Sequence, residues 1–409
     1  MVRVIVFLLC LPILSLAQGW DFSTAEKLSS GVNTEYEEAF PLLSPDGKTL
    51  YFSRILYPQN QGGKFSGSDI WISSFDQNKK VWQKAATAGK LNDRGNNAII
   101  GVSADGNTLY TMSTTGAGKP NGIFFSRKIG SSWARPELIP IPGLDPNGFL
   151  SFYVSPEQEV IFISMKATDS RGEEDLYVST KLSGNEWSRP KNLGSSINTA
   201  GFEISPYLSQ DKKRLYFSSN GHKGFGDADV FYCDRLYNSW DTWSAPRNLG
   251  EKLNSKSFDA YFSLYGDSIA YFASNRGGKY SDIYRVKVVP GNEVLAFGQR
   301  YLTTEEITAA LGANVSRRLT FEAKETGLTA AQKELLFFIA NKLSQKRDIN
   351  VQITVLEENN PALTDARINA VADELRASGV DNIRMLLTSN NPMKKANPKS
   401  TTLEILLYK

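Results

Sequence analysis

The segment Ser209-Gln-Asp-Lys-Lys-Arg-Leu-Tyr-Phe-Ser-Ser219 is one of five similar stretches that recur along this chain. Ser44-Pro-Asp-Gly-Lys-Thr-Leu-Tyr-Phe-Ser53 is the clearest copy, and the others begin at Ser103, Ser155 and Ser263. Asp-Gly pairs favour tight turns because glycine adopts positive φ at low cost, and the alternating apolar run that follows is typical of a half-buried strand. The leading serines lie 52 to 59 residues apart. This regular period predicts a repeat architecture.

The segments around each copy also recur. Downstream, an acidic residue begins a further strand, as at Asp69, Asp175, Asp229 and Asp282. Upstream, a tryptophan-bearing strand is followed by leucine and asparagine, as at Trp187 with Asn198 and at Trp243 with Asn254. Four antiparallel strands in each repeat are typical of a blade of a β-propeller.

The two ends of the repeat region complement one another. The first tryptophan-bearing strand, Trp20–Leu28, has no sheet of its own, and the last repeat, ending near Val286, lacks its fourth strand. Pairing these two segments would remove two open sheet edges at once. The sequence therefore predicts a mainly β chain, with a five-bladed β-propeller at residues 18–289 that is closed by its N-terminal strand.

Composition sets limits on the function. The chain has 409 residues and a net charge of +3, without a long basic run that would favour nucleic acid or an anionic membrane surface. Arg3, the apolar run 4–14 and the small residues Ser15 and Ala17 predict a signal peptide over residues 1–17. The mature chain would then hold a single cysteine, Cys233, and no intrachain disulfide.

From Pro290 onward the pattern changes from alternation to helical spacing. Residues 290–316 are expected to be a connector. Residues 317–409 predict a small α/β domain with the order β-α-β-α-β-β, in which Thr329 and Gln332 form the capping box of the first helix. The strands are expected at 318–322, 350–355, 383–387 and 402–407, and the second helix at 363–378.

The second helix carries a resemblance. Asn360-Pro-Ala-Leu363-Thr364-Asp-Ala-Arg367 is similar to the helix of the OmpA-like C-terminal domain, a family that binds peptidoglycan. The resemblance implies that Arg367 holds the carboxylate of diaminopimelate, within a site that includes Asn360 and Thr364. Glu358 stands near the place of the family's aspartate, although the strand end reads Val355-Leu-Glu-Glu358 where the family has Gly-His-Thr-Asp.

The propeller repeats resemble the WD-like repeats of the TolB type. The two domains together resemble cell-envelope proteins, including accessory proteins of type IX secretion. The resemblance implies a non-catalytic scaffold in the periplasm of a Gram-negative bacterium, associated with the outer membrane. Its propeller would bind an envelope protein, and its C-terminal domain would attach to peptidoglycan. In the alternative, the C-terminal domain binds a protein instead.

The residue types and motifs of the chain give little support for catalysis. The chain has one histidine, His222, and no nucleophile-elbow or phosphate-loop motif. A five-bladed glycosidase is the remaining enzymatic alternative, and it needs two carboxylates about 5–9 Å apart. The candidates are Asp21, Glu37, Glu203 and Asp259. Because no pair stands out among them, the sequence predicts that the chain is not an enzyme.

Metal binding is not expected either. Asp227 and Asp229 form the best local pair for calcium. Calcium takes six or more oxygen ligands, and no loop shows the alternating carboxylates of a dedicated site. The sequence therefore predicts no cofactor.

Overall fold

A computed structural model describes residues 20–114, 120–130, 132–144, 149–184, 186–236, 238–266, 268–290, 302–313, 315–357, 360–381, 384–388 and 400–409. The predicted signal peptide, residues 1–17, lies outside this part of the chain. The chain divides into two compact units, one comprising Trp20–Arg300 and the other most of Tyr301–Lys409. Across the described residues, no helix has the length and apolar character that a membrane crossing requires.

The described part of the larger unit contains five antiparallel sheets, whose strands follow. The first sheet holds β3 (Glu37–Leu43), β4 (Thr49–Ile55), β5 (Ser68–Asp76), β6 (Val81–Trp82) and β7 (Ala86–Thr87), and is followed by the 3₁₀ turn η1 (Gly89–Leu91). The second holds β8 (Asn96–Val102), β9 (Thr108–Thr114), β10 (Gly122–Ile129), β11 (Ser132–Trp133) and β12 (Glu137–Ile139). The third holds β13 (Ser151–Val154), β14 (Val160–Met165), β15 (Asp175–Thr180) and β16 (Lys191–Asn192). The fourth holds β17 (Glu203–Leu208), β18 (Arg214–Ser219), β19 (Asp229–Asp234) and β20 (Arg247–Asn248). The fifth holds β21 (Asp259–Tyr265), β22 (Ile269–Ser274), β23 (Asp282–Pro290), β1 (Trp20–Phe22) and β2 (Glu26–Lys27).

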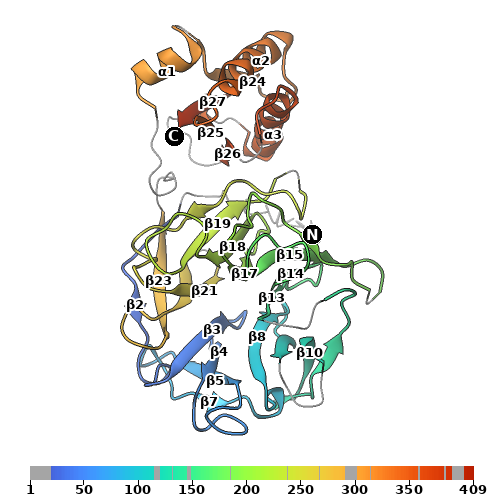
Figure 1. Cartoon of the computed structure of the whole chain (residues 1–409), viewed down its shortest axis with the longest axis vertical. Coiled ribbons are helices and arrows are strands. Elements are labelled where there is room, and N and C mark those ends of the chain that lie inside the picture. The colour runs from blue at the N-terminus through green and yellow to red at the C-terminus, as the bar shows by residue number, and fades with distance from the viewer. Residues whose placement is uncertain are drawn as a thin grey trace, which may run out of the picture. The chain divides into compact units, whose positions relative to one another are not determined.

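These sheets are arranged around a common axis. Figure 1 shows β3, β8, β13, β17 and β21, the first full strand of each sheet, nearest to the centre of the larger unit. Sheets that radiate in this way are the blades of a β-propeller. The predicted bladed fold is therefore confirmed.

The N-terminal strands complete the fifth sheet. Trp20 pairs with Pro290, and Glu26 pairs with Arg285, both in antiparallel register. The Leu28 amide donates to the Ile283 carbonyl at 3.0 Å, which continues the pairing. The predicted position of Trp20–Leu28 beside the last repeat is confirmed, and neither segment is left as an open edge.

The repeated serine forms the turn that begins the second strand of a blade. The Ser44 hydroxyl donates to Asp46 at 2.6 Å and accepts from the Thr49 amide at 3.0 Å. Ser103 and Ser209 make the same bonds in their sheets. In the fifth sheet the turn begins at Tyr265, so the predicted start at Ser263 is wrong by two residues. Ser263 instead lies within β21, opposite Tyr271.

The recurring asparagine holds the third strand of a blade. The Asn198 side chain accepts from the Leu176 amide at 2.8 Å and donates to the Leu176 carbonyl at 3.0 Å. Asn254 makes the same pair of bonds with Val230. A side-chain amide thus replaces a neighbouring strand at this point, which satisfies buried backbone groups.

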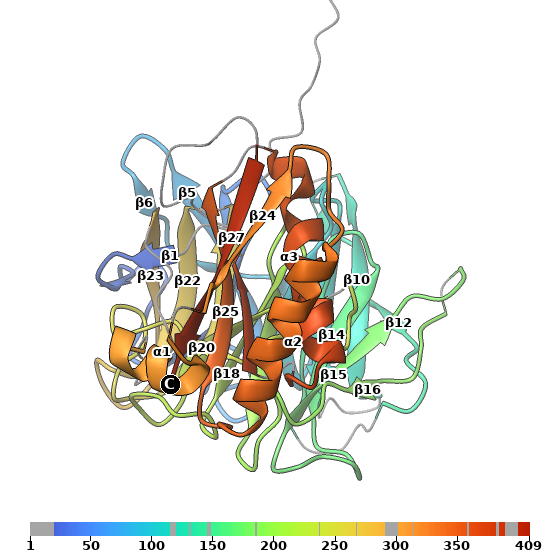
Figure 2. The same ribbon diagram turned by 90° about the horizontal axis from the view of Figure 1, so that it is seen from above.

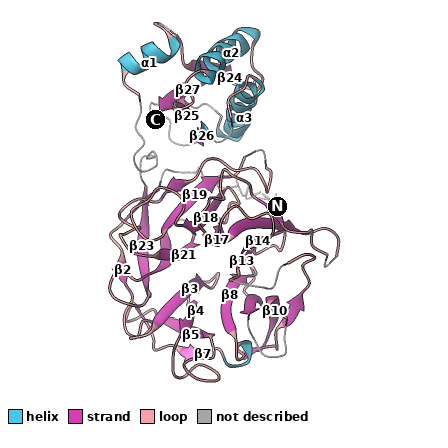
Figure 3. Ribbon diagram, viewed as in Figure 1, coloured by secondary structure: helices cyan, strands magenta, loops and turns pink. Residues whose placement is uncertain are grey.

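The smaller unit is a mixed sheet with helices. Its elements are α1 (Thr304–Leu311), β24 (Arg318–Glu322), α2 (Ala330–Ser344), β25 (Asn350–Glu357), α3 (Pro361–Ala377), β26 (Met385–Thr388) and β27 (Ser400–Tyr408). The sheet order is β24-β27-β25-β26, with β25 and β26 parallel. Helices α2 and α3 lie side by side next to this sheet (Figure 2). Figure 3 shows that the α-helices belong to this unit, whereas the larger unit is built from strands and loops apart from the short 3₁₀ turn η1.

The predicted order of elements in this unit is observed, and the capping box of Thr329 and Gln332 is confirmed. Helix α1 falls in the region that was expected to be a connector. It begins with a second capping box, formed by Thr303 and Glu306. Its residues Ala310 and Leu311 are buried in the core of the smaller unit, which accounts for a helix of only eight residues.

Candidate functional site at the centre of the propeller

Five residues occupy equivalent positions at the start of the inner strands. In each sheet, one inner-strand residue pairs with a residue near the end of the second strand, and the equivalent position lies two residues before it. In the first sheet Ala39 pairs with Ser53, so this position is Glu37. The five are Glu37, Asn96, Phe149, Phe202 and Phe258. One end of the propeller axis therefore carries a carboxyl group, an amide and three aromatic rings, and we call these residues the strand-start ring.

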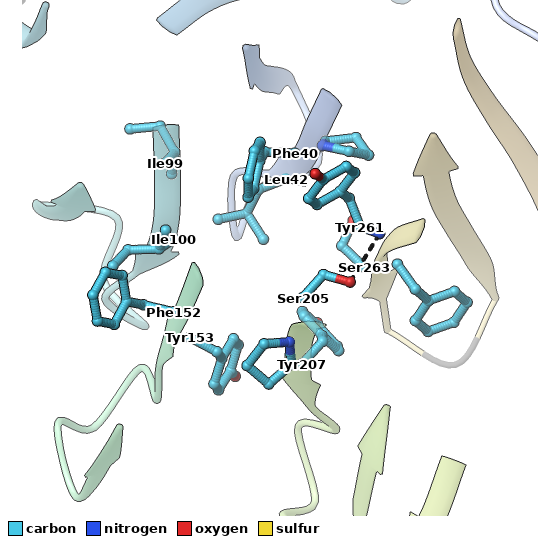
Figure 4. Close-up of a pocket in the computed structure, with 13 residues that line it drawn as sticks. Phe40, Leu42, Ile99, Ile100, Phe152, Tyr153, Ser205, Tyr207, Tyr261 and Ser263 are labelled. Carbon is cyan, nitrogen blue, oxygen red and sulfur yellow. Dashed lines mark hydrogen bonds between the residues drawn. The ribbon is translucent and has the colours of Figure 1, made fainter. Parts of the chain in front are cut away.

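Aromatic side chains continue from the strand-start ring towards the axis. The rings of Phe202 and Phe258 have centroids 6.3 Å apart, and Phe258 lies 6.4 Å from Tyr261. Tyr261 packs in turn against Phe40 at 4.1 Å. Figure 4 shows Phe40 and Tyr261 next to one another on neighbouring inner strands. The four side chains form a continuous aromatic surface.

Strand bulges place two of these rings. Phe40 and Tyr261 have φ values of 54° and 58°, in the left-handed region that bulky residues rarely adopt. Both lie where the register of the inner strand shifts against its neighbour. A bulge redirects a side chain, and such strain persists where the surrounding structure enforces it. Here it turns the two rings into the centre of the propeller.

The middle of the axis is narrow. The cavity there has a volume of about 40 Å³ and is lined by inner-strand side chains that include Phe40, Ile100, Phe152 and Tyr207 (Figure 4). One water needs roughly 10–15 Å³, so this cavity holds a few waters at most. The middle of the axis is therefore too small to hold a larger ligand such as a sugar.

Glu37 is the carboxyl group of the strand-start ring. It is half-buried, and burial raises its pKa. Its charge acts on Tyr261 of the neighbouring inner strand, whose pKa is raised first by burial and then by Glu37. Within the described chain, no hydrogen bond or ion pair engages the Glu37 carboxylate. The group is therefore available to a ligand, beside an aromatic surface.

Two of the other acids that the sequence singled out, Glu203 and Asp259, have structural partners. Glu203 accepts from the Thr199 amide at 2.8 Å and from the hydroxyls of Thr199 and Ser219 at 2.7 Å each. Asp259 accepts from Ser255 and forms an ion pair with Arg276. Both are fully buried.

Glu38, which the sequence did not single out, occupies the position on its inner strand that Glu203 and Asp259 occupy on theirs. It accepts from Thr34 and lies 3.4 Å from Arg54. Asp21 lies on β1, the outer strand of the fifth sheet. Among the candidates whose side chains the structure describes, Glu203 and Asp259 therefore have structural partners, whereas Glu37 does not.

His222 also has a structural role. Its Nε2 lies 2.7 Å from the Ile197 carbonyl, in the fourth sheet. In the first and fifth sheets, Arg54 and Arg276 donate to the equivalent carbonyls of Val32 and Leu253. The single histidine thus occupies the place of an arginine that ties a blade to the preceding loop.

The two calcium candidates do not form a site. Asp229 is buried and accepts from the Phe225 amide at 2.6 Å, whereas Asp227 is exposed. Burial raises the pKa of Asp229. Across the described chain, no group of three or more His, Cys, Asp or Glu side chains could hold a metal ion.

The predicted peptidoglycan residues lie in the smaller unit. Arg367 is fully buried and donates to Thr401 Oγ1 at 2.6 Å. It also donates to the backbone carbonyls of Glu322, at the end of β24, and Glu325, each at 2.8 Å. Thr364 is also buried, and its hydroxyl lies 3.4 Å from the Asn360 carbonyl. Glu358 lies outside the described residues. Arg367 shares the inward face of α3 with Thr364 and Val371, because residues three and four apart share a helix face.

The larger unit is thus a bladed propeller with an aromatic surface and one available carboxyl group at the start of its inner strands. Comparison with known proteins finds no matching family and no matching curated protein. Among solved structures, the chain is similar to one titled glycoside hydrolase, with 11% identity, a TM-score of 0.46, and coverage of 68% of this chain and 94% of that one. It is also similar to an endo-arabinase from Bacteroides thetaiotaomicron, with 13% identity, a TM-score of 0.43 and coverage of 67% and 100%. A third is the β-propeller domain of the trilobed protease from Pyrococcus furiosus, with 11% identity, a TM-score of 0.33 and coverage of 67% and 85%.

These findings correct the expected relationship. The similar structures carry glycoside hydrolase and arabinase titles, so the TolB-type and OmpA-like resemblance is wrong, together with the peptidoglycan attachment and the link to type IX secretion. The expectation of a non-catalytic scaffold, and that the chain is not an enzyme, is contradicted by the same titles. The resemblance rested on a short helix pattern, in which Arg367 serves the core of the smaller unit. At these identities and TM-scores the likeness carries no particular reaction over to this chain.

Proposed function

We propose that the larger unit binds a carbohydrate at the strand-start ring. The observation that carries the proposal is the available Glu37 carboxyl group beside the aromatic surface of Phe40, Tyr261, Phe258 and Phe202. A sugar has C–H faces that pack on aromatic rings and hydroxyls that need polar partners. Ligand sites typically combine an apolar wall with a few polar groups in this way.

The raised pKa of Glu37 suits this ligand class. A carboxyl group that protonates more readily can both donate to and accept from sugar hydroxyls. A glutamic acid whose pKa is raised by an apolar setting is also the usual general acid of a glycosidase. Hydrolysis needs a second carboxylate. The positions equivalent to Glu37 hold Asn96 and three phenylalanines, so Glu37 is the residue on which a proton-transfer step would depend.

We further propose that the five sheets form the complete ring of blades. Tyr153 donates to the Leu208 carbonyl, and Tyr207 donates to the Leu264 carbonyl, which joins the third, fourth and fifth sheets. The Glu38 amide donates to the Ser281 carbonyl at 2.8 Å, which joins the first sheet to the fifth. These bonds between neighbouring sheets support closure with five blades.

Isothermal titration of the whole chain with arabino-oligosaccharides, xylo-oligosaccharides and cello-oligosaccharides tests the binding proposal. We expect saturable binding of one of these series. Phe258→Ala and Glu37→Ala should each weaken it about tenfold, the scale of a central contact residue. Phe65→Ala is the matched control, because Phe65 is 87% exposed and lies on the loop before β5. Binding to none of the series, or an equal loss in the Phe65 variant, would refute the proposal.

Turnover is measured on the same samples. Release of reducing ends by the wild type that is lost in Glu37→Gln would extend the function from binding to hydrolysis. Glutamine keeps the shape and one hydrogen-bond acceptor but cannot supply the proton.

A further inference from the structure

A second cavity lies between the second and third sheets, away from the propeller axis. Its volume is about 120 Å³. Its walls include the aromatic rings of Tyr110, Phe125 and Trp187 and the cationic groups of Arg127 and Lys181. Strands β9 and β10 supply Tyr110, Phe125 and Arg127, and the segment after β15 supplies Lys181 and Trp187. This cavity thus combines aromatic walls with two positive charges, whereas the strand-start ring carries a carboxyl group.

Tyr110, one of the lining residues, has a buried hydroxyl without a hydrogen-bond partner among the described residues. Tyr110 is 1% exposed, and its hydroxyl forms no hydrogen bond with the described residues. Burial raises its pKa to about 12, so it is a donor at neutral pH. The Gln158 side chain lies beside the hydroxyl and lowers its pKa, against the larger effect of burial. Buried polar groups are nearly always satisfied, so this hydroxyl calls for an acceptor.

The two cations are held on aromatic faces and have no acidic partner among the described residues. The Arg127 guanidinium lies 5.2 Å from the Phe125 ring centroid, and Lys181 Nζ lies 5.9 Å from that of Trp187. Such cation–π contacts orient a charge without neutralising it. No Asp or Glu appears among the described residues that line the cavity. The site is therefore electropositive, and one of its lining residues carries a buried hydroxyl donor.

We propose that this cavity binds a single-ring aromatic carboxylate. An apolar cavity of about 150 Å³ accepts benzene, so about 120 Å³ is the scale of one small ring. The ring of the ligand packs against Phe125 and Trp187, and its carboxylate lies between Arg127 and Lys181. The Tyr110 hydroxyl donates to the carboxylate, which supplies the missing acceptor. The site is independent of carbohydrate binding on the axis.

Isothermal titration of the whole chain with benzoate tests this assignment, with benzyl alcohol and inorganic phosphate as matched probes. We expect benzoate to bind with Kd on the order of 1 mM or tighter, a scale reasonable for so small a ligand. Benzyl alcohol lacks the charge and phosphate lacks the ring, so each should bind at least tenfold more weakly. Equal binding of either probe, or no saturable binding of benzoate, overturns the proposal.

Variants localise the site. Arg127→Gln and Lys181→Gln should each raise the benzoate Kd about tenfold, while Lys128→Gln, on the same strand and outside the cavity lining, should leave it unchanged. Tyr110→Phe should raise the Kd several-fold without lowering the unfolding midpoint of the free protein, because it removes an unpaired hydroxyl. A Kd that is insensitive to Arg127, Lys181 and Tyr110 would place the ligand elsewhere and overturn the assignment.

Discussion

A disulfide between positions 26 and 285 would test how the two ends of the propeller chain are joined. Glu26 and Arg285 face each other in the register of β2 and β23, and their side chains form an ion pair at 2.9 Å. Opposite residues of antiparallel strands have Cα atoms about 4.5–5.5 Å apart, within the range of about 4.4–6.8 Å that disulfides accept. Replacing both residues by cysteine should therefore form the bond without moving the backbone.

The expected stabilisation follows from the length of chain that the bond encloses. The two positions are separated by 259 residues. For a loop of that length, the chain-entropy relation predicts about 5.5 kcal/mol, while disulfides more often contribute about 2–4 kcal/mol. The ion pair that is lost is largely exposed and is worth about 0.2–1 kcal/mol. The net gain should be about 2–4 kcal/mol for the oxidised protein.

Urea unfolding followed by tryptophan fluorescence measures this gain. All seven tryptophans lie between residues 20 and 243, so the signal reports on the larger unit. In a background with Cys10→Ser and Cys233→Ala, which leaves only the two introduced cysteines, the oxidised protein should unfold at a urea concentration about 1 M higher than the same protein after reduction. Identical midpoints for the two forms, or cysteines that pair only between molecules, would refute the strand pairing and with it the closure of the ring.

Three further predictions concern other parts of the chain. Arg367→Met should lower the unfolding free energy of the smaller unit by roughly 3 kcal/mol, followed by circular dichroism at the helical band, because several buried carbonyls lose their donor; an unchanged midpoint would show that Arg367 is not structural. Burial raises the pKa of Glu38 to about 7 from 4.5, so the folded state holds the proton more tightly and stability should fall as pH rises from about 4.5 to 7, by up to about 3 kcal/mol. Glu38→Gln should remove this fall in stability with rising pH. An unaltered dependence of stability on pH would show that Glu38 is not the group responsible. Gly67→Ala, where φ is +109° and a Cβ would collide with the Gly95 carbonyl, should lower the melting temperature more than Gly63→Ala, where φ is +93° and the space is open; equal losses would mean that backbone strain alone matters.

Two adjacent glutamates show how much of the site could be predicted from the sequence. Glu37 and Glu38 are neighbours of the same type, and alternation along a strand places them on opposite faces. Which face meets the axis depends on the bulge in β3 and on Thr34 and Arg54, which bind Glu38. The sequence included Glu37 among four acids but could not separate it from the others. Nothing in the local pattern indicated the strained backbone of Phe40.

The sequence by itself determined the repeat, the four-stranded blade and the pairing of Trp20–Leu28 with the last sheet. Turn chemistry and alternation act between residues that are close in the chain, so they can be read directly from it. The tertiary structure alone decided that Arg367 serves a core and that Tyr110, Arg127 and Lys181 surround one cavity. Those roles depend on which distant strands come to lie together, and each side chain acquires its partners, its burial and its available charge only after the blades have packed.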